Sequence, residues 1–225
     1  MTYGEIKIES LKLMFVNAQD VISEDWLEVY EDDETYRSYL DNMRGAINRC
    51  FATIEEKRVL PTRSKTLSVS DGNASGAFIR FDLSKLLGDF FDLDRVIMET
   101  DAGEYIADCD YRREGNVLVL PISHKLNKDT NELEPCFDGV MYTAVYSPKI
   151  QRIGIGASKD LEISDIPEHI AAYIPYYVKG ELFRDDEPNE AAEAMNQFEQ
   201  RISEIAERTV SKSNQVTSIY SQTEW

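Results

Sequence analysis

Apolar residues recur at alternating steps of four and three residues in two stretches, one toward each end of the chain. The first stripe consists of Tyr36, Leu40, Met43, Ile47, Cys50 and Ile54, and the second of Ala191, Met195, Phe198, Ile202 and Ile205. Such steps place side chains on one face of an α-helix. Each stripe therefore predicts an amphipathic helix with a narrow apolar seam.

Two shorter helices are predicted beside them. The first carries Ile8, Leu11, Met14 and Phe15 at helical spacing. The second begins at Ser164-Asp-Ile-Pro-Glu168, where a capping side chain precedes a proline in the first turn, and we expect Pro175 to kink it. An acidic run over residues 28–34 precedes the first striped helix, where negative charge meets the positive end of the helix dipole.

The middle of the chain, residues 63–163, has a different pattern. Short apolar or alternating segments recur there between turn signals, and the stretch 139–146 alternates with a period of two. Short strands at hairpin spacing are typical of an antiparallel sandwich or small barrel. A short helix is expected near residues 83–91.

Neither striped helix can bury its seam alone, so we expect the two helices to pack together. The predicted fold class is α+β, with a helical bundle from residues 1–62 and 164–210 and an inserted β domain at 63–163. A polar tail at 211–225 is expected to be extended. The residues expected to make the helix–helix contact are Tyr36, Leu40, Met43, Ile47, Met195, Phe198 and Ile202.

The charge balance narrows the possible partners. The chain has 225 residues, with 42 acidic and 24 basic side chains and a net charge of −18. Surfaces that bind nucleic-acid phosphates or anionic lipids need a basic patch, so both kinds of binding are disfavoured. The N-terminus lacks the pattern of a signal peptide, and we find no apolar run long enough to cross a bilayer.

The candidate chemical groups favour structural roles. Cys50, Cys109 and Cys136 lack metal-site spacing and are expected to be reduced, while His124 and His169 have no nucleophile motif beside them. Gly154-Ile-Gly156 lacks the lysine and serine of a phosphate-binding loop. Acidic pairs are too abundant to indicate a glycosidase or calcium site. The sequence therefore predicts no catalytic, cofactor or metal site.

Two groups of aromatic residues allow more than one structural interpretation. The cluster Tyr173, Tyr176, Tyr177 and Phe183 favours a core over a ligand pocket, because its members have helical spacing. Tyr220 and Trp225 instead lie in a polar tail, together with Ile219. Apolar groups in such a tail are typical of an arm that becomes ordered on binding a partner.

The C-terminal segment 174–202 resembles a known family. It contains Ile174-Pro-Tyr-Tyr, then Gly180-Glu-Leu-Phe, Asp185-Asp-Glu-Pro and a helix in which Ala192, Asn196, Phe198 and Glu199 recur in a fixed pattern. In these features, and in its helix–β–helix order, the chain resembles the head-to-tail connector proteins of tailed bacteriophages, also called adaptor, neck or ring proteins.

The resemblance implies a structural virion protein that is not an enzyme and has no cofactor. Such proteins are made in the host cytoplasm and form a cyclic homo-oligomer, commonly of twelve copies, at the neck. The ring binds the portal protein, receives a tail or tail-completion protein, and conducts DNA without specific binding. By this resemblance Ile219, Tyr220 and Trp225 belong to an arm that docks on the portal.

The sequence leaves two other functions open. The chain could be an accessory or tail-associated β-sandwich module that binds a carbohydrate or a receptor. A hydrolase with two carboxylates is the second alternative. The acidic composition fits the connector, since acidic channel walls repel DNA phosphates and let the duplex slide.

Overall fold

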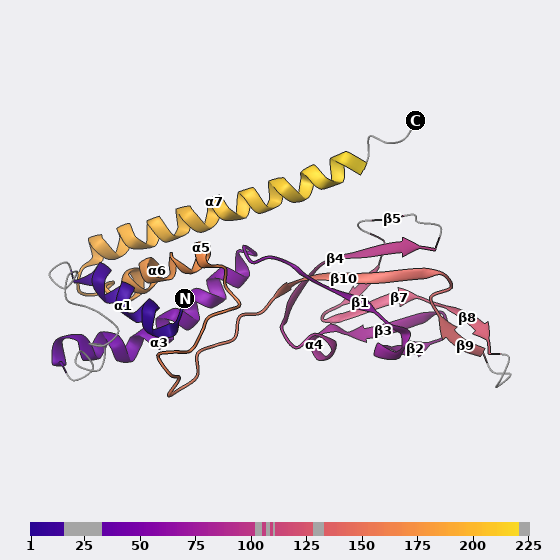
Figure 1. The fold of residues 1–225 in the computed structure, drawn as a ribbon, viewed down its shortest axis with the longest axis horizontal. Coiled ribbons are helices and arrows are strands. Elements are labelled where there is room, and N and C mark those ends of the chain that lie inside the picture. The colour runs from indigo at the N-terminus through magenta and orange to yellow at the C-terminus, as the bar shows by residue number, and fades with distance from the viewer. Residues whose placement is uncertain (16–32, 102–104, 107–108, 110, 128–132, 221–225) are drawn as a thin grey trace. The chain divides into compact units, whose positions relative to one another are not determined.

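The structure is a computed structural model, which describes residues 1–15, 33–101, 105–106, 109, 111–127 and 133–220. The protein has an α+β fold, with helices and antiparallel strands in two compact units (Figure 1). The helical unit consists of residues 1–60 and 150–225, and the β unit of residues 61–149. The helical unit is thus discontinuous in sequence, whereas the β unit is one stretch.

Within the described residues, five helices belong to the helical unit. They are α1 (Tyr3–Met14), α3 (Glu34–Glu56), α5 (Glu168–Ala171), α6 (Ile174–Leu182) and α7 (Pro188–Tyr220). Thr2 begins α1 with a capping box, in which its hydroxyl accepts from the Glu5 amide and the Glu5 carboxylate accepts from the Thr2 amide. The short helix α6 packs against α1, α3 and α7. It is therefore the central element of this unit.

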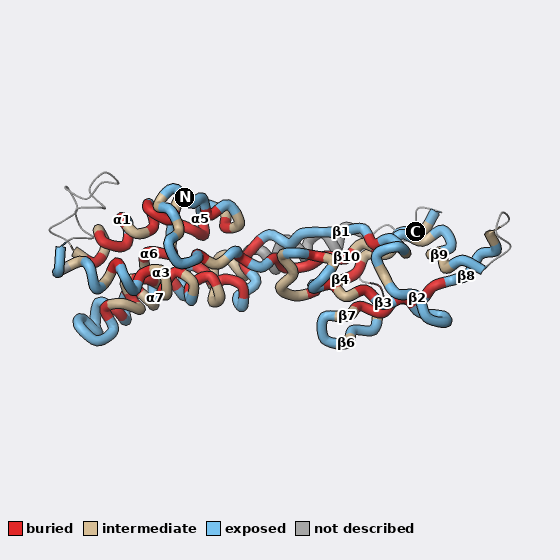
Figure 2. The backbone as a smooth tube through the Cα atoms, turned by 90° about the horizontal axis from the view of Figure 1, so that it is seen from below, coloured by how far each residue is buried: buried red, intermediate tan, exposed pale blue. Residues whose placement is uncertain are grey.

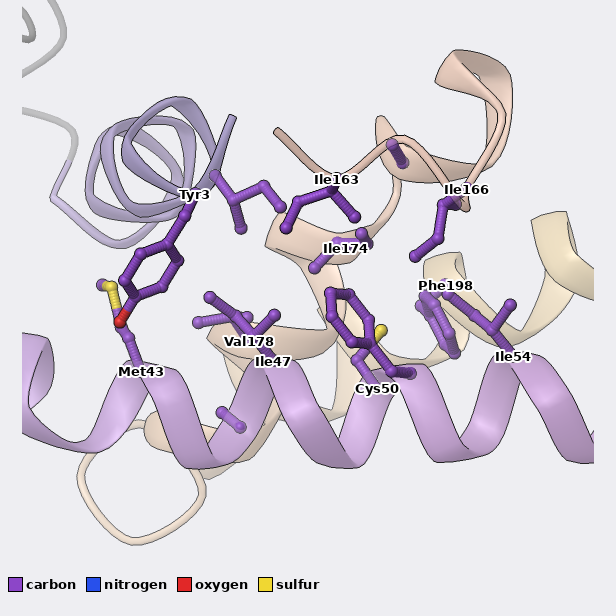
Figure 3. Packing of buried hydrophobic residues seen from close by; sticks show 14 of the residues in the cluster. Tyr3, Met43, Ile47, Cys50, Ile54, Ile163, Ile166, Ile174, Val178 and Phe198 are labelled. Carbon is purple, nitrogen blue, oxygen red and sulfur yellow. The ribbon is translucent and has the colours of Figure 1, made fainter. Parts of the chain in front are cut away.

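The two striped helices contribute to one hydrophobic cluster, part of which Figure 3 shows. Leu40, Met43 and Ile47 of α3 are buried there with Phe198 and Ile202 of α7, while Tyr36 and Met195 are half-buried against the same cluster. The N- and C-terminal parts of the chain thus share a core. All seven residues that the sequence singled out for helix packing lie in or against it.

The way in which the stripes meet differs from the direct pairing that we expected. Both α3 and α7 pack on α6, which lies between them in Figure 1. On the α7 side, the rings of Tyr177 and Phe198 meet edge to face with centroids 5.0 Å apart. The sequence pattern of α6 explains the difference, because its apolar residues point to several sides and can receive more than one helix.

A predicted kink at Pro175 is wrong. The helix is instead interrupted, since α5 ends at Ala171 and α6 begins at Ile174. Pro175 then lies in the first turn of α6, where a missing amide hydrogen leaves no carbonyl without its donor.

The β unit contains two four-stranded antiparallel sheets and a separate hairpin. The first sheet has the order β1 (Arg63–Leu67), β10 (Val140–Pro148), β4 (Phe90–Thr100) and β5 (Tyr105–Ile106). The second has the order β2 (Asn73–Ser75), β3 (Phe78–Asp82), β7 (Val117–Pro121) and β6 (Arg112–Glu114). The hairpin pairs β8 (Ser123–Leu126) with β9 (Leu133–Cys136). Two short helical turns, η3 (Val69–Asp71) and α4 (Leu83–Leu86), connect the strands.

Both sheets face one core. Val96 and Tyr142 of the first sheet are buried in the same cluster as Phe81 and Leu118 of the second. The arrangement is a sandwich of two open sheets rather than a barrel. The helix expected near residues 83–91 is shorter than that span, because strand β4 already begins at Phe90.

The predicted end of the β domain at residue 163 is wrong. Strand β10 ends at Pro148, and residues 150–163 belong to the helical unit. Ile150, Ile153 and Ile163 are buried in the helical core. The boundary drawn from the sequence placed these residues in the β domain, but they line the core of the helical unit.

The extended tail predicted for residues 211–225 also requires correction. Helix α7 continues to Tyr220, so Ile219 and Tyr220 are at its end, and Trp225 lies outside the described residues. Adding a residue to a helix that is already nucleated costs little, which explains why a polar sequence continues it. Of the acidic run 28–34, the described part is Asp33 and Glu34, and α3 begins at the latter.

Candidate assembly surface of the helical unit

A buried carboxylate holds residues 150–152 on α3. Glu55, in the last turn of α3, is 3% exposed. Its Oε1 accepts from the Ile150 amide at 2.6 Å and from Arg152 Nη1 at 3.0 Å, while Oε2 accepts from Arg152 Nη2. A buried charge is tolerated where a fork of charge-assisted hydrogen bonds satisfies it. Glu55 is therefore an anchor for the chain where it returns to the helical unit.

Asn48 makes a second anchor two turns earlier on the same side of α3. Its amide nitrogen donates to the Ile153 carbonyl at 3.0 Å, and its amide oxygen accepts from the Ile153 amide at 2.9 Å. Further along, the Tyr3 and Gly4 amides of α1 donate to the carbonyls of Leu161 and Lys159. Residues 150–163 are thus fixed at both ends, by α3 and by α1.

Between these anchors the chain presents an apolar side chain to solvent. Ile155 is 90% exposed. It is flanked by Gly154 and Gly156. The φ angle of Gly156 is +74°, a left-handed backbone conformation that residues with a side chain rarely adopt. The Gly154-Ile-Gly156 sequence therefore lies in a turn of the loop between β10 and α5, and the turn exposes Ile155.

Two arginines extend the row of Asn48 toward the start of α3. Arg44 precedes Asn48 by four residues and Arg37 precedes Arg44 by seven, so both lie on the side of the helix that holds the loop. Within the described part of the chain, neither guanidinium has a carboxylate partner. Arg49, on another side of α3, does pair with Glu181 at 3.4 Å. The exposed carboxylates of Asp33, Glu34 and Asp41 lie three or four residues from Arg37 along the chain.

The outer side of α7 carries acidic residues. Glu193, Glu204 and Glu207 recur at steps of eleven and three residues, which places them on one side of the helix, away from Phe198 and Ile202. Glu193 and Glu207 are exposed, and Glu204 is half-buried beside Arg201 at 3.0 Å. We call these three glutamates the acidic face of α7.

An aromatic cluster joins α3 to the turn between α6 and α7. Rings of Phe15, Tyr36, Tyr39 and Phe183 meet edge to face with centroids 4.9 to 5.8 Å apart. The Tyr39 hydroxyl donates to Asp186 Oδ2 at 2.6 Å. This hydrogen bond, together with burial, raises the pKa of Tyr39 to about 12.

The other predicted aromatic cluster belongs to the core. Phe183 is buried, and Tyr173, Tyr176 and Tyr177 are half-buried against the helical cluster. Lys179 lies among them: its Nζ donates to the Leu13 carbonyl at 2.9 Å and pairs with Glu190 at 2.7 Å. These contacts tie α1, α6 and α7 together.

The groups that could carry chemistry are dispersed. His124 is exposed in the β unit and His169 in the helical unit. Cys50 is buried in the helical core, which raises its pKa, Cys109 and Cys136 lie in the β unit, and all three are free thiols. Across the described residues, no group of three or more histidine, cysteine or acidic side chains could hold a metal ion.

A hollow lies near the N-terminus. It has a volume of about 340 Å³ and is lined by Met1, Glu5, Glu9, Glu168 and Ala172. Three of these five residues are glutamates, and none is a histidine, a cysteine or a serine. No helix in the described ranges is both long enough and apolar enough to cross a membrane.

The β unit exposes a few apolar side chains. Leu126 and Leu133 face each other across the β8–β9 hairpin and are 51% and 67% exposed, and Phe78 on β3 is 55% exposed. Figure 2 shows β8 as exposed throughout. A two-stranded hairpin is marginally stable on its own, so this one adds surface rather than core to the unit.

Sequence reasoning missed the anchors of residues 150–153. Glu55 follows Ile54, the last residue of the apolar stripe, and nothing beside it indicates a partner 97 residues away in Arg152. Asn48 likewise reads as an ordinary polar residue on an amphipathic helix. A carboxylate next to a buried seam was the one available signal.

The comparisons with known proteins give no relative: the chain matches no protein-family model and no curated protein. A functional proposal therefore depends on the residues and the fold.

Proposed function

We propose that this chain is a structural subunit of the head-to-tail connector of a tailed bacteriophage. In this proposal the subunits form a closed ring, commonly of twelve copies, that docks on the portal protein. The ring extends the DNA channel and receives the tail or a tail-completion protein. The subunit acts by assembly and is not an enzyme.

The observation that carries the proposal is that both ends of the chain contribute residues to the helical core. Residues from both ends of the chain, such as Met43 and Phe198, share one cluster, and the β unit lies between them in sequence (Figure 3). The segment that resembles connector proteins, residues 174–202, contains α6 and the first part of α7. The resemblance therefore falls on the central element of the helical unit.

The distribution of charge also supports a ring around DNA. Residues 1–60 and 150–225 hold 27 of the 42 acidic residues but 14 of the 24 basic ones. A helical unit of this charge that faces a channel repels phosphates, so DNA passes without being bound. The same charge opposes association, so the contacts between subunits have to overcome it.

The end of α7 is the portal-docking arm in this proposal. Ile219 and Tyr220 are the last helical residues, and Trp225 follows five residues later. Apolar side chains near the end of a chain can act as anchors in an apolar groove of a partner.

Electron microscopy and native mass spectrometry of the full-length protein test this function. The protein is examined alone and mixed with the portal protein encoded in the same genome. We expect closed rings on the portal vertex, with a mass that corresponds to a fixed number of copies. Free monomer in the presence of portal contradicts the proposal.

A pair of matched variants tests the arm. Tyr220→Ala combined with Trp225→Ala is expected to weaken portal binding at least tenfold without changing the far-UV circular dichroism. Phe78→Ala removes an exposed aromatic from the β unit and serves as the control, with portal binding as in the wild type. Equal portal binding by both variants contradicts an arm at these residues.

Exposed apolar groups on the β unit favour a second candidate, a binding module for a carbohydrate or receptor. Phe78 could stack on a sugar, and Leu126 with Leu133 forms a small apolar pair. This function predicts glycan binding without portal and its loss in Phe78→Ala. The connector predicts portal binding that Phe78→Ala leaves unchanged.

A further inference from the structure

We propose that the helical unit and the β unit are joined by a hinge with a single axis, which runs from residues 61–62 to residues 149–150. The chain passes between the units twice, once after Leu60 and once after Lys149. Two bodies that are linked at one flexible point can rotate in every direction, whereas a second link leaves rotation about the line that joins the two links. This inference does not depend on the proposed function, because a single subunit shows it.

The first crossing contains two residues that belong to neither core. Leu60 is 3% exposed and lies in the helical cluster. Arg63 begins β1, where it pairs with Tyr146 of β10. Between them, Pro61 and Thr62 are exposed and belong to no helix or strand. Because the ring of Pro61 fixes its φ angle, rotation at this crossing depends on the ψ angle of Pro61 and on both backbone angles of Thr62.

The second crossing has no residue to spare. The amide of Lys149 donates to the Asp89 carbonyl at 2.6 Å, within the β unit. The next amide, that of Ile150, donates to Glu55 Oε1 at 2.6 Å, within the helical unit, and Ile150 is 1% exposed. Two consecutive residues are therefore held by different units. Rotation at this crossing is confined to the φ and ψ angles of Lys149, as is usual for hinges made of one or a few residues between rigid elements.

Asp89 holds both crossings together on the β side. Its carboxylate accepts from Arg63 Nη1 and, at 3.0 Å, from the Tyr146 hydroxyl, and its carbonyl accepts from the Lys149 amide. The start of β1 and the end of β10 are thus tied to one residue, and neighbouring strands lie about 5 Å apart. A pair of links this close bends most easily about the line through both, because a twist or a sideways bend would stretch one of them.

Each unit keeps its own core when the hinge bends. The buried apolar residues form two clusters, one from residues 1–60 and 150–225 and the other from residues 61–149. Relative motion is the usual expectation for domains with separate cores. A partner that binds the β unit can therefore tilt it without breaking either cluster. In the proposed ring, the β unit would tilt while the helical unit stays in place.

Residual dipolar couplings of isoleucine, leucine and valine methyl groups in the full-length protein test the hinge. Each unit reports its own alignment, since each core holds several of these residues. We expect the alignments of the two units to differ, and the difference to fit rotation about one axis.

Lengthening one crossing gives the sharpest comparison. Two glycines inserted after Thr62 leave Lys149 as the one tight link, so the β unit gains rotation about further axes. The ratio of the two alignments should then depart from 1 at least twofold more than in the wild type. The matched control inserts two glycines after Gly115, in the exposed turn between β6 and β7, and should leave the ratio as in the wild type.

The results that overturn the hinge are distinct. One alignment shared by both units of the wild type means a rigid body, and couplings that fit no single axis mean a free joint. An unchanged ratio in the Thr62 insertion means that the two crossings do not set the axis. None of these results touches the connector proposal, which ring formation with portal tests separately.

A second variant covers the case in which the insertion disturbs folding. If methyl signals within either core shift in the Thr62 insertion, Pro61→Gly takes its place. This substitution frees one φ angle at the first crossing, so the ratio of alignments should change in the same direction by a smaller amount. An unchanged ratio in Pro61→Gly would then count against the hinge.

Discussion

The helical unit and the β unit differ in how far apart along the sequence their contacting residues lie. In the helical unit, Glu55 binds the amide of Ile150, 95 residues later, and α6 receives helices from both ends of the sequence. In the β unit, β2 with β3, β6 with β7 and β8 with β9 are neighbours in sequence, and β1 with β10 closes the unit. The helical unit therefore forms only when the segment after the β unit packs on the segment before it. The β unit, in contrast, is one continuous stretch of residues.

The two units also place their charged groups differently. In the helical unit the carboxylate of Glu55 is buried and its partner Arg152 is 34% exposed, whereas Arg80 and Glu114 of the β unit form an ion pair with side chains 54% and 32% exposed. Exposed pairs contribute little, because water screens them and holding two long side chains costs entropy. We therefore expect the Glu55 contacts to contribute more to stability than the pair of Arg80 and Glu114.

Separating the units gives the largest expected effect. Residues 61–149 expressed alone should fold, with a cooperative urea transition and dispersed amide signals in NMR spectra. Residues 1–60 alone should lack stable helix, because α3 has no α6 on which to bury its seam. An unfolded 61–149 fragment would contradict the independence of the β unit.

Removing the buried carboxylate should have the next largest effect. Glu55→Ala leaves the Ile150 amide and Arg152 without their acceptor and is expected to cost about 3 kcal/mol in the free energy of unfolding of the helical unit. Glu114→Ala in the β unit, the matched change at an exposed pair, should cost less than about 1 kcal/mol. Urea denaturation followed by circular dichroism measures both, and equal losses would refute the difference between the units.

Adding a methyl group between α6 and α7 should lower the stability of the helical unit by an intermediate amount. A Cβ at Gly180 would lie 3.0 Å from the Ala191 carbonyl oxygen and 3.2 Å from Met195 Cβ. Gly180→Ala is therefore expected to destabilise the helical unit by about 1–2 kcal/mol, since the helices have to move apart. Gly88→Ala in the β unit meets no atom within 4 Å and is the control. Thermal unfolding that is unchanged in Gly180→Ala would show that the two helices can separate freely.

The smallest expected effect concerns the Tyr39 hydroxyl. Tyr39→Phe removes its hydrogen bond to Asp186 and should cost about 1 kcal/mol at pH 7. The pKa of Tyr39 is about 12 in the folded protein against 10.0 ordinarily, so the unfolded chain loses this proton first as the pH rises. The contribution of Tyr39 is therefore present below pH 10 and is lost between pH 10 and 12.

An alkaline titration of stability checks this prediction. The difference in free energy of unfolding between wild type and Tyr39→Phe should shrink between pH 10 and 12. Tyr146→Phe, which removes the hydroxyl that contacts Asp89 in the β unit, provides the comparison. If the difference in free energy of unfolding between wild type and Tyr39→Phe grew as the pH rose, the hydrogen bond assigned to Tyr39 would be contradicted.

The candidate assembly surface shows how far sequence reasoning reaches. Arg37 and Arg44 are ordinary in the sequence, and Ile155 lies in Gly154-Ile-Gly156, which lacks the other residues of a phosphate-binding loop. Only the coordinates show that Asn48 binds the loop at Ile153 and that Ile155, two residues later, is 90% exposed. The resemblance to connector proteins predicted that the subunits assemble, but not which surfaces meet.

The sequence by itself determined the elements whose pattern is local. The α+β class and the helix containing Met43 follow from apolar periodicity, because side-chain spacing along one segment decides which face is buried. The tertiary structure decided what depends on distant partners: the central position of α6, the transfer of residues 150–163 to the helical core, and the burial of Glu55. These features lie beyond local periodicity because each needs an atom from a segment that the chain brings close only by folding.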